Sequence, residues 1–326
     1  MQKIKIGVLG CASIAERSVI PAILSIPVFE LIAVSSRSAE KANKFAQQFN
    51  CEAVVGYQNL LNRKDIDVIY IPLPTGLHEE WVLKTLAAGK HILIEKSVAS
   101  NYVSAKKMVE MARKKGLLLM ENFMFLHHQQ HQLVKQLIKD GKIGEIRSFR
   151  SSFGFPPLSA ANFRYQKELG GGALLDAGAY TVRACQFFLG NELKVEAATL
   201  NYLNFEVDIF GGAFLKSANG MFAEIAFGFD NFYQCNYEIW GSKGKITASR
   251  AFTPKVDFSP TITLEQDSEV FDYKVEVDNH FVNILNELIR CLAENDFENN
   301  YQEILNQSSL LQELKDKSEY SSLERG

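Results

Sequence analysis

The strongest constraint on this chain is the alternation of short apolar runs with amphipathic stretches over its first part. The apolar runs have the length of buried strands, and the stretches between them carry apolar residues at helical spacing. Strands that alternate with helices form right-handed crossovers and a doubly wound, mostly parallel sheet. We therefore predict strands over Ile4–Leu9, Leu31–Ser35, Val68–Ile71, His91–Ile94 and Leu117–Met120, and helices over Ala39–Phe49, His78–Ala88 and Tyr102–Lys115.

The pattern changes after Asn122, where runs that alternate polar and apolar residues take over. Runs of strands favour an antiparallel sheet over further crossover units. We predict strands over Ile146–Phe153, Lys194–Leu203, Ala213–Phe214, Met221–Phe229, Tyr233–Trp240 and Lys245–Ala248, and helices over Gln129–Asp140, Ala179–Leu189, His280–Glu294 and Tyr301–Leu314. The residues from Asp316 onward look solvated. The 326 residues thus predict two α/β domains, 1–122 and 123–326.

Charge and cysteine usage exclude several function classes. The net charge of −3 gives no global basic field for nucleic acid or anionic lipid. No apolar run approaches the roughly 20 residues that span a bilayer, and the N-terminus lacks the features of a signal peptide. The five cysteines are scattered, without a Cys-x-x-Cys pair, which favours reduced thiols and no zinc site. We expect a cytoplasmic protein with no nucleic-acid or membrane partner.

The turn after the first strand has the form of a dinucleotide-binding loop. The usual pattern is Gly-x-Gly-x-x-Gly/Ala at the start of a helix whose amides hold a pyrophosphate. Here Gly10 supplies the tight turn, and Ala12 replaces the second glycine. Ser13 and Ile14 complete the candidate phosphate loop, and Ala15 takes the third position.

The end of the second strand favours NADP over NAD. An acidic residue there would bind the ribose hydroxyls of NAD. This chain has Ser36, Arg37 and Ser38 instead, with Lys41 following. A guanidinium matches a 2′-phosphate, and serine hydroxyls add donors. The alternative is an ordinary solvated arginine at a strand end.

Several segments, taken in order, resemble the glucose–fructose oxidoreductase / inositol dehydrogenase family over nearly the whole chain. They are Gly7–Ala15, Pro72–His78, Glu95-Lys96, Glu121–Met124, Gly144–Ile146 and Gly170–Tyr180. The resemblance implies an N-terminal Rossmann domain and a C-terminal domain with a large open, mostly antiparallel sheet. It implies further cofactor contacts along the strand ends, at Pro72, Leu73, Pro74, Leu77, His78, Glu95, Lys96 and Asn122.

The resemblance also supplies candidate catalytic residues. Lys96 matches the lysine of the family's Glu-Lys-Pro motif, with Ser97 in place of the proline. Tyr180 replaces the histidine of an Asp-x-Gly-x-His motif that begins at Asp176, as in the family's sugar ketoreductases and its dihydrodiol or xylose dehydrogenases. A phenol can protonate a carbonyl oxygen if a neighbouring cation lowers its pKa, and we expect Lys96 to be that cation. Asp176 would orient the sugar or Lys96, while the alternative for Tyr180 is a core aromatic.

The segment before the Gly-rich stretch borders the substrate in this family. Candidate substrate residues are Phe155, Asn162, Phe163, Arg164 and Tyr165, with His128, Asp176 and Tyr180. Loop packing is an equally good explanation for Asn162, Phe163 and Arg164. The neighbouring His127, His128 and His131 lack metal-ligand spacing, so no metal site is expected.

Together these features predict hydride transfer between NADP(H) and a sugar carbon, with a nucleotide-linked ketosugar as the favoured substrate. A free-sugar or dihydrodiol dehydrogenase is the enzymatic alternative. A catalytically silent NADP-binding regulator is the alternative of another class. The open sheet of the second domain has an outer face to cover, so we expect a homodimer or homotetramer through that sheet.

Overall fold

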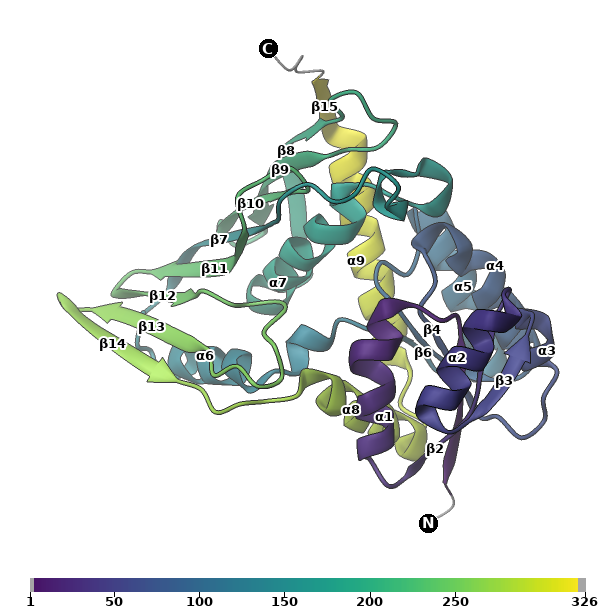
Figure 1. The fold of residues 1–326 in the computed structure, drawn as a ribbon. Coiled ribbons are helices and arrows are strands. Elements are labelled where there is room, and N and C mark those ends of the chain that lie inside the picture. The colour runs from purple at the N-terminus through teal and green to yellow at the C-terminus, as the bar shows by residue number, and fades with distance from the viewer. Residues whose placement is uncertain (1–2, 322–326) are drawn as a thin grey trace. The chain divides into compact units, whose positions relative to one another are not determined.

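The chain packs into two compact units, and the computed structural model describes residues 3–321 (Figure 1). The first unit comprises the chain up to Asn122 together with Phe281–Leu305, and the second comprises Phe123–His280 together with the chain from Asn306. The boundary after Asn122 coincides with the predicted one. Residues 281–305 depart from the predicted division, because they pack with the first unit and not with the rest of 123–326. The functional assignment of the two predicted domains stays a prediction.

The first unit is built on a six-stranded parallel sheet, which confirms the predicted fold class. The strand order is β3-β2-β1-β4-β5-β6. Their bounds are β1 Ile4–Leu9, β2 Phe29–Ser36, β3 Glu52–Val55, β4 Val68–Ile71, β5 His91–Ile94 and β6 Leu119–Glu121. The order reverses between β1 and β4, and ligands of such sheets bind beyond the carboxyl ends of the strands at that point.

The helices of this unit begin and end at residues that satisfy their free backbone groups. Ser38 Oγ accepts from the Lys41 amide at the start of α2 (Ala39–Phe49), and Asn101 does the same at α5 (Tyr102–Lys115). Such caps are visible in the sequence, so both predicted ranges match. The other helices are α1 Ile20–Ser25 after a π turn over Ala15–Val19, α3 Tyr57–Leu61, α4 His78–Ala87, most of α8 His280–Glu294, and the first part of α9 Glu298–Lys317.

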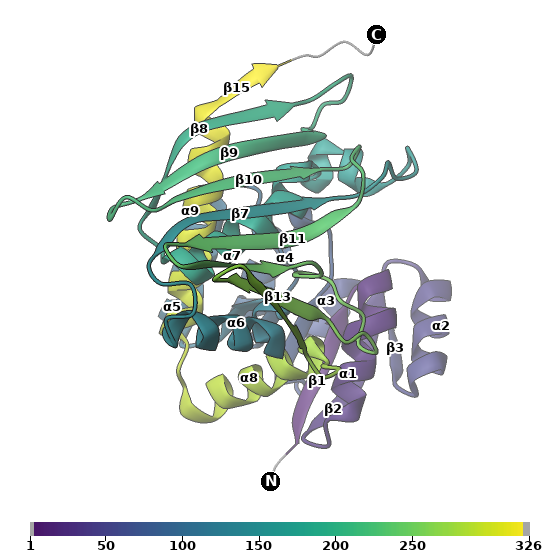
Figure 2. The same cartoon turned by 90° about the vertical axis from the view of Figure 1, so that its left-hand side faces the viewer.

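The second unit contains a nine-stranded, mostly antiparallel sheet, as predicted. The strand order is β14-β13-β12-β11-β7-β10-β9-β8-β15, and only the pairs β7–β10 and β8–β15 are parallel (Figure 2). Bounds are β7 Ile146–Gly154, β8 Leu193–Asn201, β9 Phe210–Ser217, β10 Phe222–Gly228, β11 Gln234–Gly241, β12 Gly244–Ala248, β13 Thr261–Gln266, β14 Glu269–Lys274 and β15 Ser318–Ser321. Helix α7 (Ala179–Leu189) packs against β7 and β10, and α6 spans Gln129–Lys139.

Four strands escape the sequence prediction: β3, β13, β14 and β15. β3 is short and mostly exposed, so it carries no apolar run. The β13–β14 hairpin turns through Asp267 and Ser268, both with positive φ, and β14 is largely exposed. The prediction of a solvated end from Asp316 is wrong over Ser318–Ser321, which pairs with β8. The final residues of that segment, 322–326, lie outside the described part of the chain. No helix within residues 3–321 is long and apolar enough to cross a membrane.

A cluster of three buried histidines lies in the second unit. The His131 ring lies 2.9 Å from both the Tyr237 hydroxyl and the Ala251 carbonyl oxygen. His128 accepts the Gln130 amide at the start of α6, and its ring centroid is 5.8 Å from that of His280. His128 is fully buried, so the predicted substrate contact at this residue is wrong. Over residues 3–321, no group of three or more potential ligands is arranged to hold a metal ion.

These histidines should make the fold sensitive to acid. Burial lowers the pKa of His131 and of His280 to about 3, and neighbouring His128 adds to the effect. Unfolding returns each ring to a pKa of about 6.5, so the unfolded chain binds more protons below that pH. We expect stability to be complete above pH 7 and to fall as the pH drops below 6.5. The loss at pH 5 is about 2 kcal/mol per buried ring.

Urea unfolding at pH 8 and pH 5 measures this loss. His131→Gln should be less stable at pH 8 but should show a smaller fall between the two pH values. His127→Gln, at a half-buried neighbour, serves as the matched control. An unchanged pH dependence in His131→Gln would mean that other groups cause acid unfolding.

Candidate functional site

Gly10 allows the chain to leave β1 where the strand order reverses. Its φ is +126°, and a Cβ at this position would lie 2.8 Å from Leu73 Cδ2. Its amide donates to the Ser35 carbonyl oxygen at 3.0 Å. Only glycine combines this backbone conformation with such close packing. The turn is therefore held between the end of β2 and the loop after β4.

Beyond Gly10 the chain exposes the start of a helix. Ala12, Ser13 and Ile14 are all at least partly accessible, and the Ala12 carbonyl oxygen accepts the Glu16 amide. The helix then continues through the π turn Ala15–Val19. The first amides of a helix have no partner within it, and they can bind a phosphate group. The predicted phosphate loop thus has both the position and the accessibility that it needs.

The end of β2 presents two cations beside the start of α2. Arg37 and Lys41 are both exposed. The Ser38 amide donates to Ser36 Oγ at 3.2 Å, which leaves the Ser36 hydroxyl proton available to a ligand. Burial raises the pKa of the Tyr57 phenol, while the Arg37 guanidinium acts in the opposite direction. Arg37 therefore lies close to Tyr57, at the edge where a 2′-phosphate is expected.

His78 joins two loops at the carboxyl ends of the strands. Its Nε2 lies 2.7 Å from the Leu73 carbonyl oxygen, and its Nδ1 lies 3.0 Å from that of Ser97. The ring is fully buried, and burial lowers its pKa to about 4. A direct cofactor contact, as predicted for His78, does not fit this setting, so we describe it as a positioning residue. Pro74 and Leu77 remain partly accessible, whereas Pro72 and Leu73 are buried.

Glu95 and Lys96 follow β5 directly. The Glu95 carboxylate accepts from the Tyr70 hydroxyl and from Asn122 Nδ2, both at 2.6 Å. Burial raises the pKa of Glu95, and those two donors together with the Lys96 charge limit the rise. Lys96 is partly accessible, and the peptide between Lys96 and Ser97 is cis.

Two further residues of this corner escaped the sequence analysis. The Glu121 carboxylate accepts the Val98 amide at 2.7 Å and so holds the loop after Lys96. Tyr70 lies in the middle of a buried strand, where its hydroxyl carries no pattern that marks it. Glu121 stands beside Asn122 at the end of β6, which is the signal that could have identified it.

In the second unit, Asp176 lies in a π turn over Leu174–Gly178, and Tyr180 lies at the start of α7. Arg164 Nε donates to the Asp176 carboxylate at 2.6 Å. Burial would lower the pKa of Arg164, but Asp176 outweighs it, and the Tyr180 phenol contributes in the same direction. Arg164 is thus a cation near Tyr180 within this unit. From the sequence, only Lys96 was expected to be that cation.

Tyr180 lies almost fully buried among aromatic side chains. Its ring centroid is 5.2 Å from that of Phe153, and the rings of Phe123, Phe125 and Phe252 also contact it. Its hydroxyl is 3.9 Å from Met124 Sδ. The ring therefore packs as a core aromatic, as the alternative explanation had it, while its hydroxyl retains a polar neighbourhood through Arg164.

The loop before the Gly-rich stretch contains both structural and accessible residues. Asn162 Oδ1 accepts the Arg164 amide, and the Tyr165 hydroxyl accepts the Leu158 amide, so both residues shape the loop. The Tyr165 ring stacks on Phe205 with centroids 4.9 Å apart, and Phe155 stacks in the same way on Phe229. Phe163 and Phe205 are the more exposed rings, and Phe205 had no marking pattern in the sequence.

Comparison with known proteins places both units in one family. Residues 4–123 match the model of an oxidoreductase family with an NAD-binding Rossmann fold, and residues 131–247 match the GFO/IDH/MocA C-terminal domain. A dTDP-3,4-didehydro-2,6-dideoxy-alpha-D-glucose 3-reductase from Saccharopolyspora spinosa is 46% identical over 81% of this chain and 80% of its own. A reductase of the same name from Actinomadura kijaniata is 42% identical over 85% and 84%.

Among solved structures, KijD10 is similar to this chain over its whole length. KijD10 is a 3-ketoreductase from Actinomadura kijaniata, in complex with NADP and TDP-benzene. The TM-score is 0.96 at 37% sequence identity, over 99% of this chain and all of KijD10. The two matched family domains, the reversal of strand order at β1 and the nine-stranded sheet agree with one another. This chain belongs to the Gfo/Idh/MocA family of oxidoreductases.

Proposed function

We propose that this protein is an NADP-dependent reductase that converts the ketone of a nucleotide-linked sugar to a secondary alcohol. The observation that carries the proposal is the similarity to KijD10 over the whole chain, together with the presence of both Lys96 and Tyr180. Structures of KijD10 exist with a lysine or a tyrosine replaced. Those two residues have the same separation in sequence as Lys96 and Tyr180.

The proposed chemistry divides between the cofactor and two side chains. When bound, NADPH would supply the hydride for the carbonyl carbon. Tyr180 donates its phenolic proton to the carbonyl oxygen, which balances the reduction. Lys96, placed after β5 beside Glu95, donates a hydrogen bond to that oxygen and stabilises the charge that develops there. Arg164 favours the tyrosinate that Tyr180 becomes, because its cation lies near the phenol.

Cofactor choice depends on the exposed edge at the end of β2. Arg37 and Lys41 offer positive charge there, and the Ser36 and Ser38 hydroxyls surround the same position. These cations would bind the 2′-phosphate of NADP through charge-assisted hydrogen bonds. The ribose hydroxyls of NAD would lack the acidic residue that usually binds them at this position. Gly10, Ala12, Ser13 and Ile14 would hold the pyrophosphate.

The sugar side of the site is proposed around the loop that carries Arg164. Asp176 neutralises Arg164 and fixes its guanidinium, so its proposed role is to orient Arg164, not Lys96. Phe163 is accessible and lies beneath the Arg164 guanidinium, whose Cζ is 4.8 Å from the ring centroid. Phe155, Asn162 and Tyr165 would support this surface through their stacking and backbone contacts.

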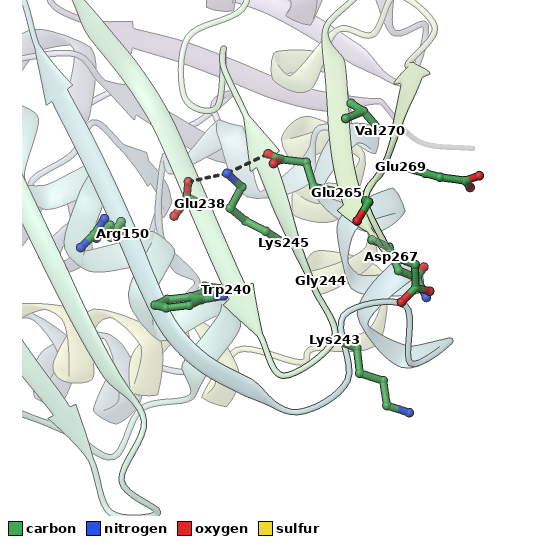
Figure 3. A pocket seen from close by; sticks show the side chains of 12 residues that line it. Arg150, Glu238, Trp240, Lys243, Gly244, Lys245, Glu265, Asp267, Glu269 and Val270 are labelled. Atoms are coloured by element: carbon green, nitrogen blue, oxygen red, sulfur yellow. Dashed lines mark ion pairs between the residues drawn. The ribbon is translucent and has the colours of Figure 1, made fainter.

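Oligomer formation and location in the cell complete the proposal. The outer face of the nine-stranded sheet carries an exposed Trp240 beside Lys245, which lies 2.7 Å from Glu265 and 3.5 Å from Glu238 (Figure 3). Phe214 lies on the same face, since it pairs with Glu224 and through it with Arg150. An accessible face of this composition supports a homodimer or homotetramer. All five cysteines are free thiols, which supports a reducing cytoplasm.

Replacement of Arg37 tests the cofactor assignment. Arg37→Ala should weaken NADPH binding about tenfold or more, because it removes a charge-assisted contact to the 2′-phosphate. NADH binding should stay the same, and titration of each cofactor by its fluorescence measures both. Lys44→Ala, an exposed lysine further along α2, is the control. Equal losses for the two cofactors would remove the role assigned to Arg37.

Replacement of Tyr180 tests the proton donor. Tyr180→Phe should lower kcat for a dTDP-linked 3-keto sugar by about 100-fold, because general acid catalysis contributes on that order. The dissociation constant of NADPH should not change. Tyr273→Phe on β14 is the matched control. Near-normal turnover in Tyr180→Phe would assign the proton to another group.

Substrate class is tested with the unmodified protein. Initial rates with NADPH should be high for dTDP-linked keto sugars, and the oxidation of free xylose or of dihydrodiols with NADP+ should be slow. The reverse order of rates would identify the free-sugar or dihydrodiol dehydrogenase instead. No turnover of either class, with NADPH bound, would support the silent regulator.

A further inference from the structure

We propose that Asp208 is a positioning residue that anchors the start of the helix carrying Asp176 and Tyr180. Neither the family resemblance nor the motif pattern points to this residue, which lies in the segment between β8 and β9. The expected effect of Asp208 on kcat rests on the proposed reductase function. The expected effect on hydrogen exchange at the start of the helix does not.

Asp208 provides two acceptors to the first free amides of this helix. Its carboxylate accepts the Leu174 amide at 2.6 Å, and its backbone carbonyl oxygen accepts the Ala173 amide at 2.8 Å. Amides at a helix start have no partners within the helix, and a negative charge there also interacts favourably with the helix dipole. A residue distant in sequence thus performs the part of an N-cap.

Gly172 makes this approach possible. Its φ is +114°, and a Cβ there would lie 2.3 Å from the Asp208 carboxylate. Any other residue would push the carboxylate away from the helix start. The glycine-rich stretch that ends at Gly172 therefore has a second use, as space for Asp208.

The segment that carries Asp208 is itself fixed. The Ile209 amide donates to the Asn201 carbonyl oxygen at 2.7 Å, and the Ile209 carbonyl oxygen accepts the Phe229 amide at 2.8 Å. Val207 and Ile209 on either side are buried. Asp208 therefore links the catalytic helix to the sheet, through β8 and the end of β10, and not to a loose loop.

The setting also makes the anchor sensitive to pH. Burial raises the pKa of Asp208 to about 6, while its backbone donors and the charge of Lys315 on α9 act in the opposite direction. As the pH falls through 6, the carboxylate becomes neutral and loses its charge interaction with the helix start. Above that pH the charge is present and the anchor is complete.

Two measurements on Asp208→Asn test the proposal. By hydrogen exchange with NADPH present, the peptide that covers Ala173–Tyr180 should exchange at least about fivefold faster than in the wild type, the size expected for loss of a helix cap. By kinetics, kcat for a dTDP-linked 3-keto sugar should fall about tenfold, because a small displacement of a reacting group has that effect. The wild-type kcat should decline as pH falls through about 6, and this decline should vanish in Asp208→Asn.

Controls separate anchoring from general damage. Asp257→Asn, an exposed aspartate in the same unit, should leave exchange and kcat unchanged. Gly172→Ala displaces the carboxylate without removing it, and it should reproduce both the faster exchange and the lower kcat. The dissociation constant of NADPH should stay the same in every variant, which also shows that each is folded.

The outcomes distinguish the two proposals. If Asp208→Asn exchanges faster but the wild-type protein reduces no keto sugar, the anchor is supported and the proposed function is refuted. If Asp208→Asn is active, exchanges at the wild-type rate and still loses kcat as the pH falls through about 6, the anchor is refuted and the proposed function is unaffected.

Discussion

The imidazole of His78 is the contact on which the arrangement at the strand ends depends. Its Nε2 lies 2.7 Å from the Leu73 carbonyl oxygen and its Nδ1 lies 3.0 Å from that of Ser97, so the buried neutral ring donates to one of these oxygens and packs against the other. Leu73 in turn packs over Gly10, and Ser97 follows Lys96 directly. A single side chain therefore connects the loop that closes over the phosphate turn with the loop that carries the lysine. Its burial keeps it out of reach of ligands and makes it a fixed link.

Three acidic side chains of the proposed reductase have different electrostatic settings because their hydrogen-bond and charge partners differ. Glu95 accepts from two neutral donors and is raised in pKa by burial. Asp176 is paired with the Arg164 guanidinium at 2.6 Å. Asp208 accepts hydrogen bonds from backbone amides, and burial raises its pKa to about 6. The neighbours of a carboxylate, more than its residue type, thus decide whether it orients a cation, holds neutral donors or responds to pH.

The sequence predicted elements with strong periodicity and clear caps, such as α2, α5 and β4, because burial and capping leave local marks. It missed β14, which is largely exposed, and β15, which pairs with the distant strand β8. Lys96 and Tyr180 could be named as candidate catalytic residues because they lie in motifs that resemble those of a known family. The partners Arg164 and Asp208 could not be assigned their contacts, because these join segments that no local pattern links.

Two π turns occur in the described chain. Ala15–Val19 follows the candidate phosphate loop, and Leu174–Gly178 contains Asp176 and directly precedes α7. A π turn holds one more residue than the α turn that it replaces. Removal of a single residue from Leu174–Gly178 would let this turn close as a regular α turn, and the helix beyond it would stay in register. Removal of a residue from the regular part of α7 would instead rotate the residues beyond it by about 100° about the helix axis. The π turn is therefore a place where this helix can lose a residue and still keep the direction of Tyr180.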